Sequence, residues 1–247
     1  GKGVSPGVNT GKPVNIERSL DFSVPAKMSL DEGIVELTSR YKGIVEKYNS
    51  SSREVEAEVL EAYILILNDP ELVDSLSNLN SSHLEEIYNI FLEQAEVFKQ
   101  MDDDYFRQRS EDIEAIGKEL IFTIQNVSLE IDMETPQVIF ANELTPNETS
   151  SMNLNQVTGF VVKEGGPTSH AVIVAKNYGI PCILDISVQD FDIENTNEVI
   201  INGTSGELTI NPDKSSLKIV EDYQLTAISY QENYKQESLD KLEIELR

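Results

Sequence analysis

The sequence predicts an α/β domain into which a bundle of helices is inserted. Short apolar runs separated by turn residues, typical of strands, occur before residue 22 and again from about residue 125. Between them, apolar residues recur every three or four positions, which is typical of amphipathic helices. We therefore expect a discontinuous α/β domain over 1–21 and 125–213, a helical subdomain over 22–124, and a terminal helix or linker over 214–247.

The elements of the inserted bundle follow one another with short turns. Asp69 as a cap and Pro70 at the first helical position predict the start of one helix. Ser82 and Glu85 indicate a capping box at the start of another. Three further helices are predicted by apolar spacing alone, over about 30–48, 55–67 and 105–124.

Strands alternate with helices on either side of this bundle. Glycine and proline surround a β-like piece at 12–16 near the amino terminus. Apolar runs bounded by Gly, Pro, Asn and Asp predict later strands at 138–141, 159–162, 182–184, 199–201 and 208–210. Helices are expected between these strands at about 149–156 and 169–178. Strands alternating with helices indicate an α/β domain.

The most informative motif is the run Gly165-Gly166-Pro167-Thr168-Ser169-His170, which is followed by a helical pattern that ends at Gly179-Ile180-Pro181. The glycines allow a sharp turn, Thr168 or Ser169 can cap the helix, and the first free amides face the side chain at the helix start. A free imidazole has a pKa near ~6.5, so a neutral ring nitrogen can attack phosphorus while helix-end amides receive the phosphoryl oxygens. We interpret His170 as a phosphohistidine.

Four residues around His170 have expected roles. Gly165, Gly166 and Ser169 shape an anion pocket, and the hydroxyl of Thr168 holds the tautomer of His170. Two plainer interpretations stay open. A lone histidine is often a capping or surface residue, and Thr168 is equally suited to be a simple helix cap.

Composition excludes several functions. The net charge of −25, from 44 acidic and 19 basic residues, argues against binding to nucleic acid. Residues 28–124 hold 22 acidic and 8 basic side chains, a net of −14, so a basic protein partner would be steered there. The chain has one cysteine, Cys182, which permits no intrachain disulfide and fits a reducing cytoplasm.

Other recognisable signals are absent from the sequence. No secretory signal and no apolar run of about 18 residues occurs, so we expect a cytoplasmic protein without membrane insertion. The second histidine, His83, has no Cys or His partner at metal-ligand spacing. No glycine-rich loop of the Walker type occurs, so direct use of ATP is not expected.

Several further motifs precede the histidine run in a fixed order. They are Ser5-Pro6-Gly7, Asn68-Asp69-Pro70-Glu71-Leu72, Asp102-Asp103-Asp104-Tyr105 through Ile116-Gly117-Lys118, and Leu144-Thr145-Pro146-Asn147-Glu148-Thr149. With the histidine motif, they resemble the amino-terminal half of enzyme I, the phosphoenolpyruvate-protein phosphotransferase of the bacterial sugar phosphotransferase system. The resemblance covers nearly the whole chain.

The resemblance implies an α/β phosphohistidine (swivelling) domain with an inserted all-α helical-bundle subdomain. His170 would take phosphate from phosphoenolpyruvate bound on a carboxy-terminal barrel and pass it to the small carrier protein HPr. A (β/α)8 barrel takes ~250 residues, so a chain of 247 residues cannot hold it as well. We expect part of a longer enzyme that exchanges phosphate with HPr, has no cofactor of its own, and meets phosphoenolpyruvate and magnesium only through the barrel.

The resemblance also implies a face that binds HPr. Its residues would be Leu65, Leu72, Phe98 and Phe106, surrounded by Asp69, Glu71, Arg109 and Asp112. Ordinary core packing stays equally open for the apolar members of this set, because periodicity cannot distinguish a buried stripe from a docking stripe.

Four positions depart from the family pattern. Asp185 stands where glycine is usual and Asn202 where aspartate is common, and the other two departures keep other functions open. The family commonly has a lysine seven residues before a histidine on the helix that faces the active histidine, and here these positions are Glu56 and Tyr63. A carboxylate at Glu56 would repel a phosphoryl group and slow its transfer.

One alternative function is that of a swivelling domain of a pyruvate phosphate dikinase or phosphoenolpyruvate synthase, which usually has cysteine at the position of Ser169. The other is an acidic adaptor whose histidine is idle.

Overall fold

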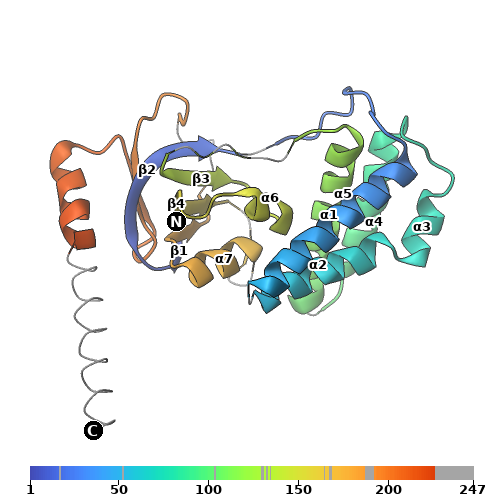
Figure 1. Ribbon diagram of the computed structural model, residues 1–247, viewed down its shortest axis with the longest axis horizontal. Helices are drawn as coiled ribbons and strands as arrows, with labels where there is room; N and C mark the ends of the chain where they lie inside the picture. Colours follow the sequence, from blue (N-terminus) through green and yellow to red (C-terminus); the bar gives the residue numbers. More distant parts are fainter. Residues whose placement is uncertain are drawn as a thin grey trace, which may run out of the picture. The chain divides into compact units, whose positions relative to one another are not determined.

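The computed structural model describes residues 1–16, 18–51, 53–102, 104–128, 131, 133, 135–163, 165–166, 169–186 and 192–225, with the backbone alone for 104–108. Internal contacts divide the chain into two compact units (Figure 1). The first, called here the sheet unit, comprises Gly1–Glu17, Asp132–Leu144 and Asn153–Arg247. The second, the helical unit, comprises Arg18–Ile131 and Thr145–Met152. The expected fold class, an α/β domain with a helical subdomain, is confirmed.

The described strands of the sheet unit form one mixed sheet in the order β1-β5-β4-β3-β2-β6-β7. Strands β2 to β5 are parallel neighbours, whereas β1 pairs antiparallel with β5, and β6 pairs antiparallel with both β2 and β7. The strands are β1 Lys2–Ser5, β2 Val8–Asn15, β3 Gln137–Ala141, β4 Val157–Val162, β5 Cys182–Leu184, β6 Val199–Asn202 and β7 Glu207–Ile210.

The central strands are apolar on both faces because both faces are covered. Alternate residues on one face, such as Val138, Phe140 and Val161, form a buried cluster with β5 and β6. Helix α7, His170–Tyr178, contacts β1 and β4 and buries Val172 and Val174. Every residue of β3 is accordingly buried, as expected for a parallel strand inside an α/β unit.

The turn between β6 and β7 lies directly against β1, and this approach requires glycine. A Cβ atom on Gly203 would lie 2.0 Å from the carbonyl oxygen of Ser5, and one on Gly3 would lie 2.2 Å from the carbonyl oxygen of Gly203. Any larger side chain would have to separate the two backbones. The sheet can therefore curl so that its β6–β7 end meets its opposite edge.

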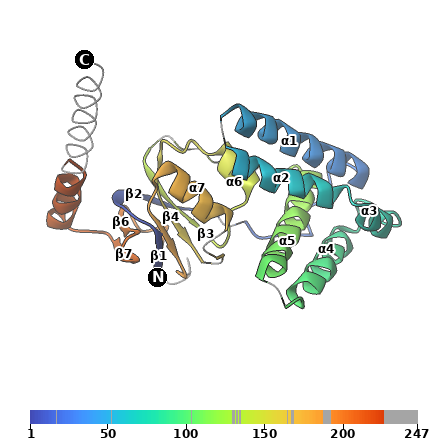
Figure 2. The same ribbon diagram turned by 90° about the horizontal axis from the view of Figure 1, so that it is seen from below.

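The helical unit is built from two helix pairs with short additions. Helix α1 packs along α2, α4 packs along α5, and α1 also contacts α5 (Figure 2). Their shared core includes Leu37, Leu60, Phe91 and Ile116, all fully buried. The helices are α1 Leu30–Ser50, α2 Glu54–Leu67, α3 Pro70–Leu76, α4 Leu84–Lys99, α5 Asp104–Ile124 and α6 Pro146–Ser151.

One of the two predicted helix caps is confirmed, and the other is wrong because its hydroxyl bonds to a different side chain. Asp69 caps α3, as predicted, because its carboxylate accepts from the amides of Glu71 and Leu72. The capping box predicted at Ser82 and Glu85 is wrong. Helix α4 has His83 at its N-cap, and the Ser82 hydroxyl donates to the Asn80 side chain instead.

The helix expected at 149–156 begins and ends earlier, as α6. Thr145 and Glu148 form a reciprocal capping box that starts the helix at Pro146. The chain becomes extended at Met152, which ends it. A further helix occupies 214–225 with the Asp213 carboxylate accepting from the Ser216 amide at its start. Within the described ranges, none of the helices is both long and apolar enough to cross a membrane.

Candidate functional site

The histidine motif lies between β4 and α7 in the sheet unit. Helix α7 begins at His170, with Ser169 as an extended N-cap residue. The Ser169 amide donates to the Gly166 carbonyl at 3.0 Å, which closes the turn before the helix. Gly165 has a φ of +117°, a backbone conformation that residues with a Cβ atom rarely adopt. The loop thus brings Gly165, Gly166, Ser169 and His170 together at one helix end.

Packing holds the helix end in place. Ala171 and Val172 are buried directly behind His170, whose own side chain is only 9% exposed. The carbonyl of Ser169 accepts from the amides of Val172 and Ile173, both at 3.1 Å. Amides of a first helical turn face outward along the axis, where they and the helix dipole favour an anion. An anion held there would lie beside the imidazole.

One polar atom in this loop needs a partner. The Ser169 hydroxyl oxygen is buried and has no hydrogen-bond partner among the described residues. A buried hydroxyl without a partner is costly, so a bound oxygen acceptor would relieve it. An oxygen acceptor bound at the start of α7 could take this proton, and the expected role of Ser169 in an anion pocket stays a prediction. Thr168, the expected tautomer-holding residue, lies outside the described residues, and its role stays a prediction.

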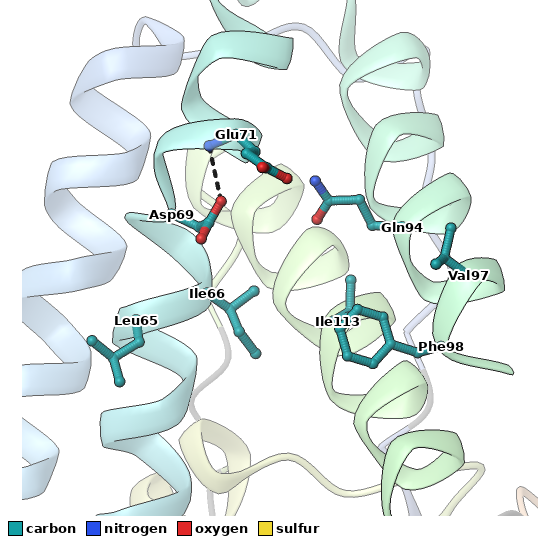
Figure 3. Close-up of a pocket in the computed structure, with 8 residues that line it drawn as sticks. All are labelled: Leu65, Ile66, Asp69, Glu71, Gln94, Val97, Phe98 and Ile113. Atoms are coloured by element: carbon teal, nitrogen blue, oxygen red, sulfur yellow. Dashed lines mark hydrogen bonds between the residues drawn. The ribbon is translucent and has the colours of Figure 1, made fainter. Parts of the chain in front are cut away.

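A second feature is a groove on the helical unit, with a cavity volume of about 420 Å³. Figure 3 shows its side chains, which come from α2, α4, α5 and the start of α3. Leu65 and Val97 are 73% and 57% exposed, so this surface leaves large apolar groups in water. The residues that line it are Leu65, Ile66, Asp69, Glu71, Gln94, Val97, Phe98 and Ile113.

Charged residues lie at the groove and beside it. Glu71 is exposed, while the Asp69 carboxylate is already engaged as the cap of α3. Arg109 and Asp112, on the same helix as Ile113, form an ion pair at 2.9 Å. The groove itself therefore combines exposed apolar side chains with the anionic Glu71, and the ion pair lies on one of its helices.

The expected HPr-binding set is only partly at this surface. Leu72 is fully buried in the helical core, so the expectation that it faces a partner is wrong, and ordinary core packing holds for it. The Phe106 side chain lies outside the described residues. Sequence reasoning missed Ile66, Gln94, Val97 and Ile113, because periodicity alone does not indicate which side of an apolar stripe stays uncovered.

The departures from the family pattern at Glu56 and Tyr63 are both buried. Glu56 is 1% exposed, and its carboxylate pairs at 3.0 Å with Arg53, whose guanidinium lies 4.0 Å from the centre of the Tyr48 ring. The negative charge expected to repel a phosphoryl group is therefore compensated within the helical unit. Tyr63 is also buried and donates its hydroxyl to Asp112 at 2.8 Å.

Two other groups have pKa values that burial raises. Glu119 is 2% exposed and accepts from the Tyr41 hydroxyl and the Asn147 amide, both at 2.9 Å. Burial raises the pKa of Glu119 to about 7. Burial also raises the pKa of the Cys182 thiol to about 12, which keeps it protonated and unreactive. Across the described residues, no three acidic, His or Cys side chains lie close enough together to hold a metal ion.

Two protein-family models match most of this chain. Residues 1–109 match the family described as "PEP-utilising enzyme, N-terminal", and residues 133–206 match "PEP-utilising enzyme, mobile domain". Proteins named phosphoenolpyruvate-protein phosphotransferase are 29% identical in Priestia megaterium and 33% identical in Listeria monocytogenes, over 89% and 82% of this chain. The chain spans 39% and 38% of those two proteins.

Solved structures agree with this assignment. An NMR solution structure of Enzyme I shares 25% identity and a TM-score of 0.57, over 94% of this chain and 98% of that one. An N-terminal domain of "Enzyme 1 - Nitrogen" shares the fold with a TM-score of 0.56 at 20% identity, over 92% of this chain and 98% of that chain.

Proposed function

Because the chain belongs to the PEP-utilising enzymes, as the amino-terminal part of an enzyme I, we propose that it carries a phosphoryl group on His170 and exchanges it with a protein carrier. The observation that carries the proposal is the position of His170 as the first residue of α7, next to the buried Ser169 hydroxyl and the first-turn amides. The name that the relatives share, phosphoenolpyruvate-protein phosphotransferase, supports the same chemistry.

The proposed step is an in-line transfer between two imidazoles. A neutral ring nitrogen of His170 attacks the phosphorus of a phosphohistidine on the carrier, a new N–P bond forms, and the carrier's N–P bond breaks with its electron pair returning to the leaving imidazole. A loose, metaphosphate-like transition state needs positioning and charge stabilisation more than covalent help. The Ser169 hydroxyl and the amides of the first turn of α7 would supply that stabilisation.

The proposed carrier is HPr, and the groove of the helical unit is its proposed docking face. Leu65 and Val97 offer exposed apolar area, and Glu71 with Arg109 and Asp112 offers charges for orientation. The acidic excess of residues 28–124 would speed the approach of a basic carrier. Phe98 and Asp69 complete the proposed face.

The donor chemistry is proposed to reside outside this chain, in a further part of the longer enzyme. Phosphoenolpyruvate and the magnesium that accompanies it would act on that part, and His170 would receive the phosphoryl group from there. The cytoplasm is the proposed location, since the single cysteine fits a reducing compartment. The exchange of phosphate with HPr is the part of the proposed reaction that can be assayed with this chain by itself.

The test is incubation of the chain with phosphorylated HPr and, separately, with phosphoenolpyruvate and magnesium. Intact mass spectrometry would then detect an acid-labile phosphate on the chain. We expect labelling by phosphorylated HPr only, and none in His170→Ala. Labelling that persists in His170→Ala would refute the assignment of the nucleophile, whereas HPr binding without any labelling would favour the idle adaptor. Labelling by phosphoenolpyruvate and magnesium alone would show that this chain has a donor site of its own, contrary to the proposal.

A further inference from the structure

A buried tyrosine holds the ion pair next to the groove. The Tyr63 hydroxyl donates to Oδ1 of Asp112 at 2.8 Å, and Nη1 of Arg109 donates to Oδ2 of the same carboxylate at 2.9 Å. The tyrosine comes from α2, and the ion pair lies on α5. Each carboxylate oxygen is thus engaged by a different helix, so the carboxylate cannot rotate without breaking one of these bonds.

This anchoring changes what the ion pair can do. Arg109 and Asp112 are 25% and 24% exposed, and a pair of this kind spaced i,i+3 on a helix surface ordinarily contributes little, because holding two flexible side chains costs entropy. Tyr63 is itself fixed, since its ring is 3% exposed and packs edge-on against Tyr41 at a centroid distance of 5.8 Å. The guanidinium of Arg109 is therefore held before any partner arrives.

The held guanidinium lies on the same face of α5 as one residue of the groove. Arg109 is four residues, about one helical turn, before Ile113, which lines the groove. The anionic Glu71 lies at the groove as well. We therefore expect a partner of the groove to present a cation toward Glu71 and, where it extends along α5, an oxygen acceptor toward Arg109.

We infer that Tyr63 is a positioning residue for docking: through Asp112 it holds Arg109 ready to bind an acceptor oxygen on the carrier protein. This inference rests on the proposed function, because it takes the groove as the docking face. It gives Tyr63 a role of its own, although the position departs from the family's histidine. Arg109 touches the partner, and Tyr63 acts only through Asp112.

The test measures binding of unphosphorylated HPr by calorimetric titration to four chains: the unchanged protein, Tyr63→Phe, Arg109→Ala and the double variant. Tyr63→Phe keeps the ring and removes only the hydroxyl. We expect it to weaken binding roughly fivefold, corresponding to about 1 kcal/mol of lost preorganisation. The same change should have no effect in the Arg109→Ala background, because the residue it positions is gone.

Tyr41→Phe is the matched control. Tyr41 is equally buried, packs against Tyr63, and donates to another α5 carboxylate, Glu119, two turns from Asp112. Its loss should leave the HPr affinity unchanged. In the labelling assay, Tyr63→Phe should raise the KM for phosphorylated HPr and leave the maximal rate of His170 labelling unchanged, whereas general loosening of the fold would lower both affinity and rate.

Each outcome decides the inference. An unchanged affinity in Tyr63→Phe, or an equal loss that persists in the Arg109→Ala background, would overturn it while leaving the proposed function intact. If the unchanged protein binds no HPr, the docking face and this inference fall together. If circular dichroism shows that Tyr63→Phe does not fold, Asp112→Asn replaces it, because it also releases Arg109 and is expected to show the same loss and the same dependence on Arg109.

Discussion

Replacing the buried carboxyl of Glu119 by an amide should make the helical unit more stable at alkaline pH. Oε2 of Glu119 accepts from the Tyr41 hydroxyl and the Asn147 amide, and Oε1 is buried without a hydrogen-bond partner among the described residues. Burial is the main cause that raises the pKa of Glu119, to about 7, and the nearby Glu148 carboxylate adds to it. Glu119→Gln keeps the side-chain shape and removes the charge.

The sign and size follow from the difference between the folded and unfolded pKa values. Below the unfolded value of 4.5 both states hold the proton, so Glu119 costs nothing. Between 4.5 and about 7 the unfolded chain ionises while the folded one keeps its proton, and stability falls as pH rises. At 1.36 kcal/mol per pKa unit, the loss above pH 7 amounts to about 3 kcal/mol. Glutamine escapes this loss, because it stays neutral at every pH.

Urea unfolding followed by circular dichroism at two pH values tests this reasoning. At about pH 5, wild type and Glu119→Gln should differ by less than about 1 kcal/mol, and at about pH 8 the variant should be more stable by about 3 kcal/mol. Glu111→Gln, at an exposed position on the same helix, is the control and should change the free energy of unfolding by less than about 0.5 kcal/mol at either pH. A difference between wild type and Glu119→Gln that does not depend on pH would refute the argument.

Three other predictions concern local structure and docking. Gly179 has a φ of +64°, so Gly179→Ala should lower the free energy of unfolding by about 1 kcal/mol, whereas Gly43→Ala, in a helix with open space around it, should raise it by about 0.5 kcal/mol; equal signs in urea unfolding would contradict the backbone argument. Leu65→Ser should weaken HPr binding without changing the free energy of unfolding, whereas Leu72→Ala should lower that free energy by about 2–5 kcal/mol. The reverse pattern would show that the docking face is not at Leu65. Asp69→Ala should cost about 1 kcal/mol by removing the cap of α3, and Asp69→Asn only a few tenths; a similar loss in both would argue that charge, not the cap bond, matters.

The sequence predicted most elements because their signals are local. Apolar spacing indicated the long helices, and the Asp69-Pro70 pair indicated the start of α3, since a cap needs only residues within one turn. The histidine motif also predicted the start of α7 at His170. Two helix starts were predicted wrongly for different reasons. The hydroxyl of Ser82 bonds to a competing local partner, Asn80, and does not cap α4. The start of α6 was missed although its signal, the Thr145–Glu148 capping box, is local.

Only the tertiary structure decided which side chains face water and which charges are compensated. Leu65 and Leu72 follow the same apolar pattern, yet one is exposed at the groove and the other is in the core, because neighbouring helices cover only the second. The charge of Glu56 is compensated by Arg53, and Tyr63 reaches Asp112 across two helices. Periodicity reports the geometry of one helix, whereas burial and pairing depend on which helices meet. The sequence therefore determined the elements and the histidine motif, and packing determined the groove and the anchoring of Arg109.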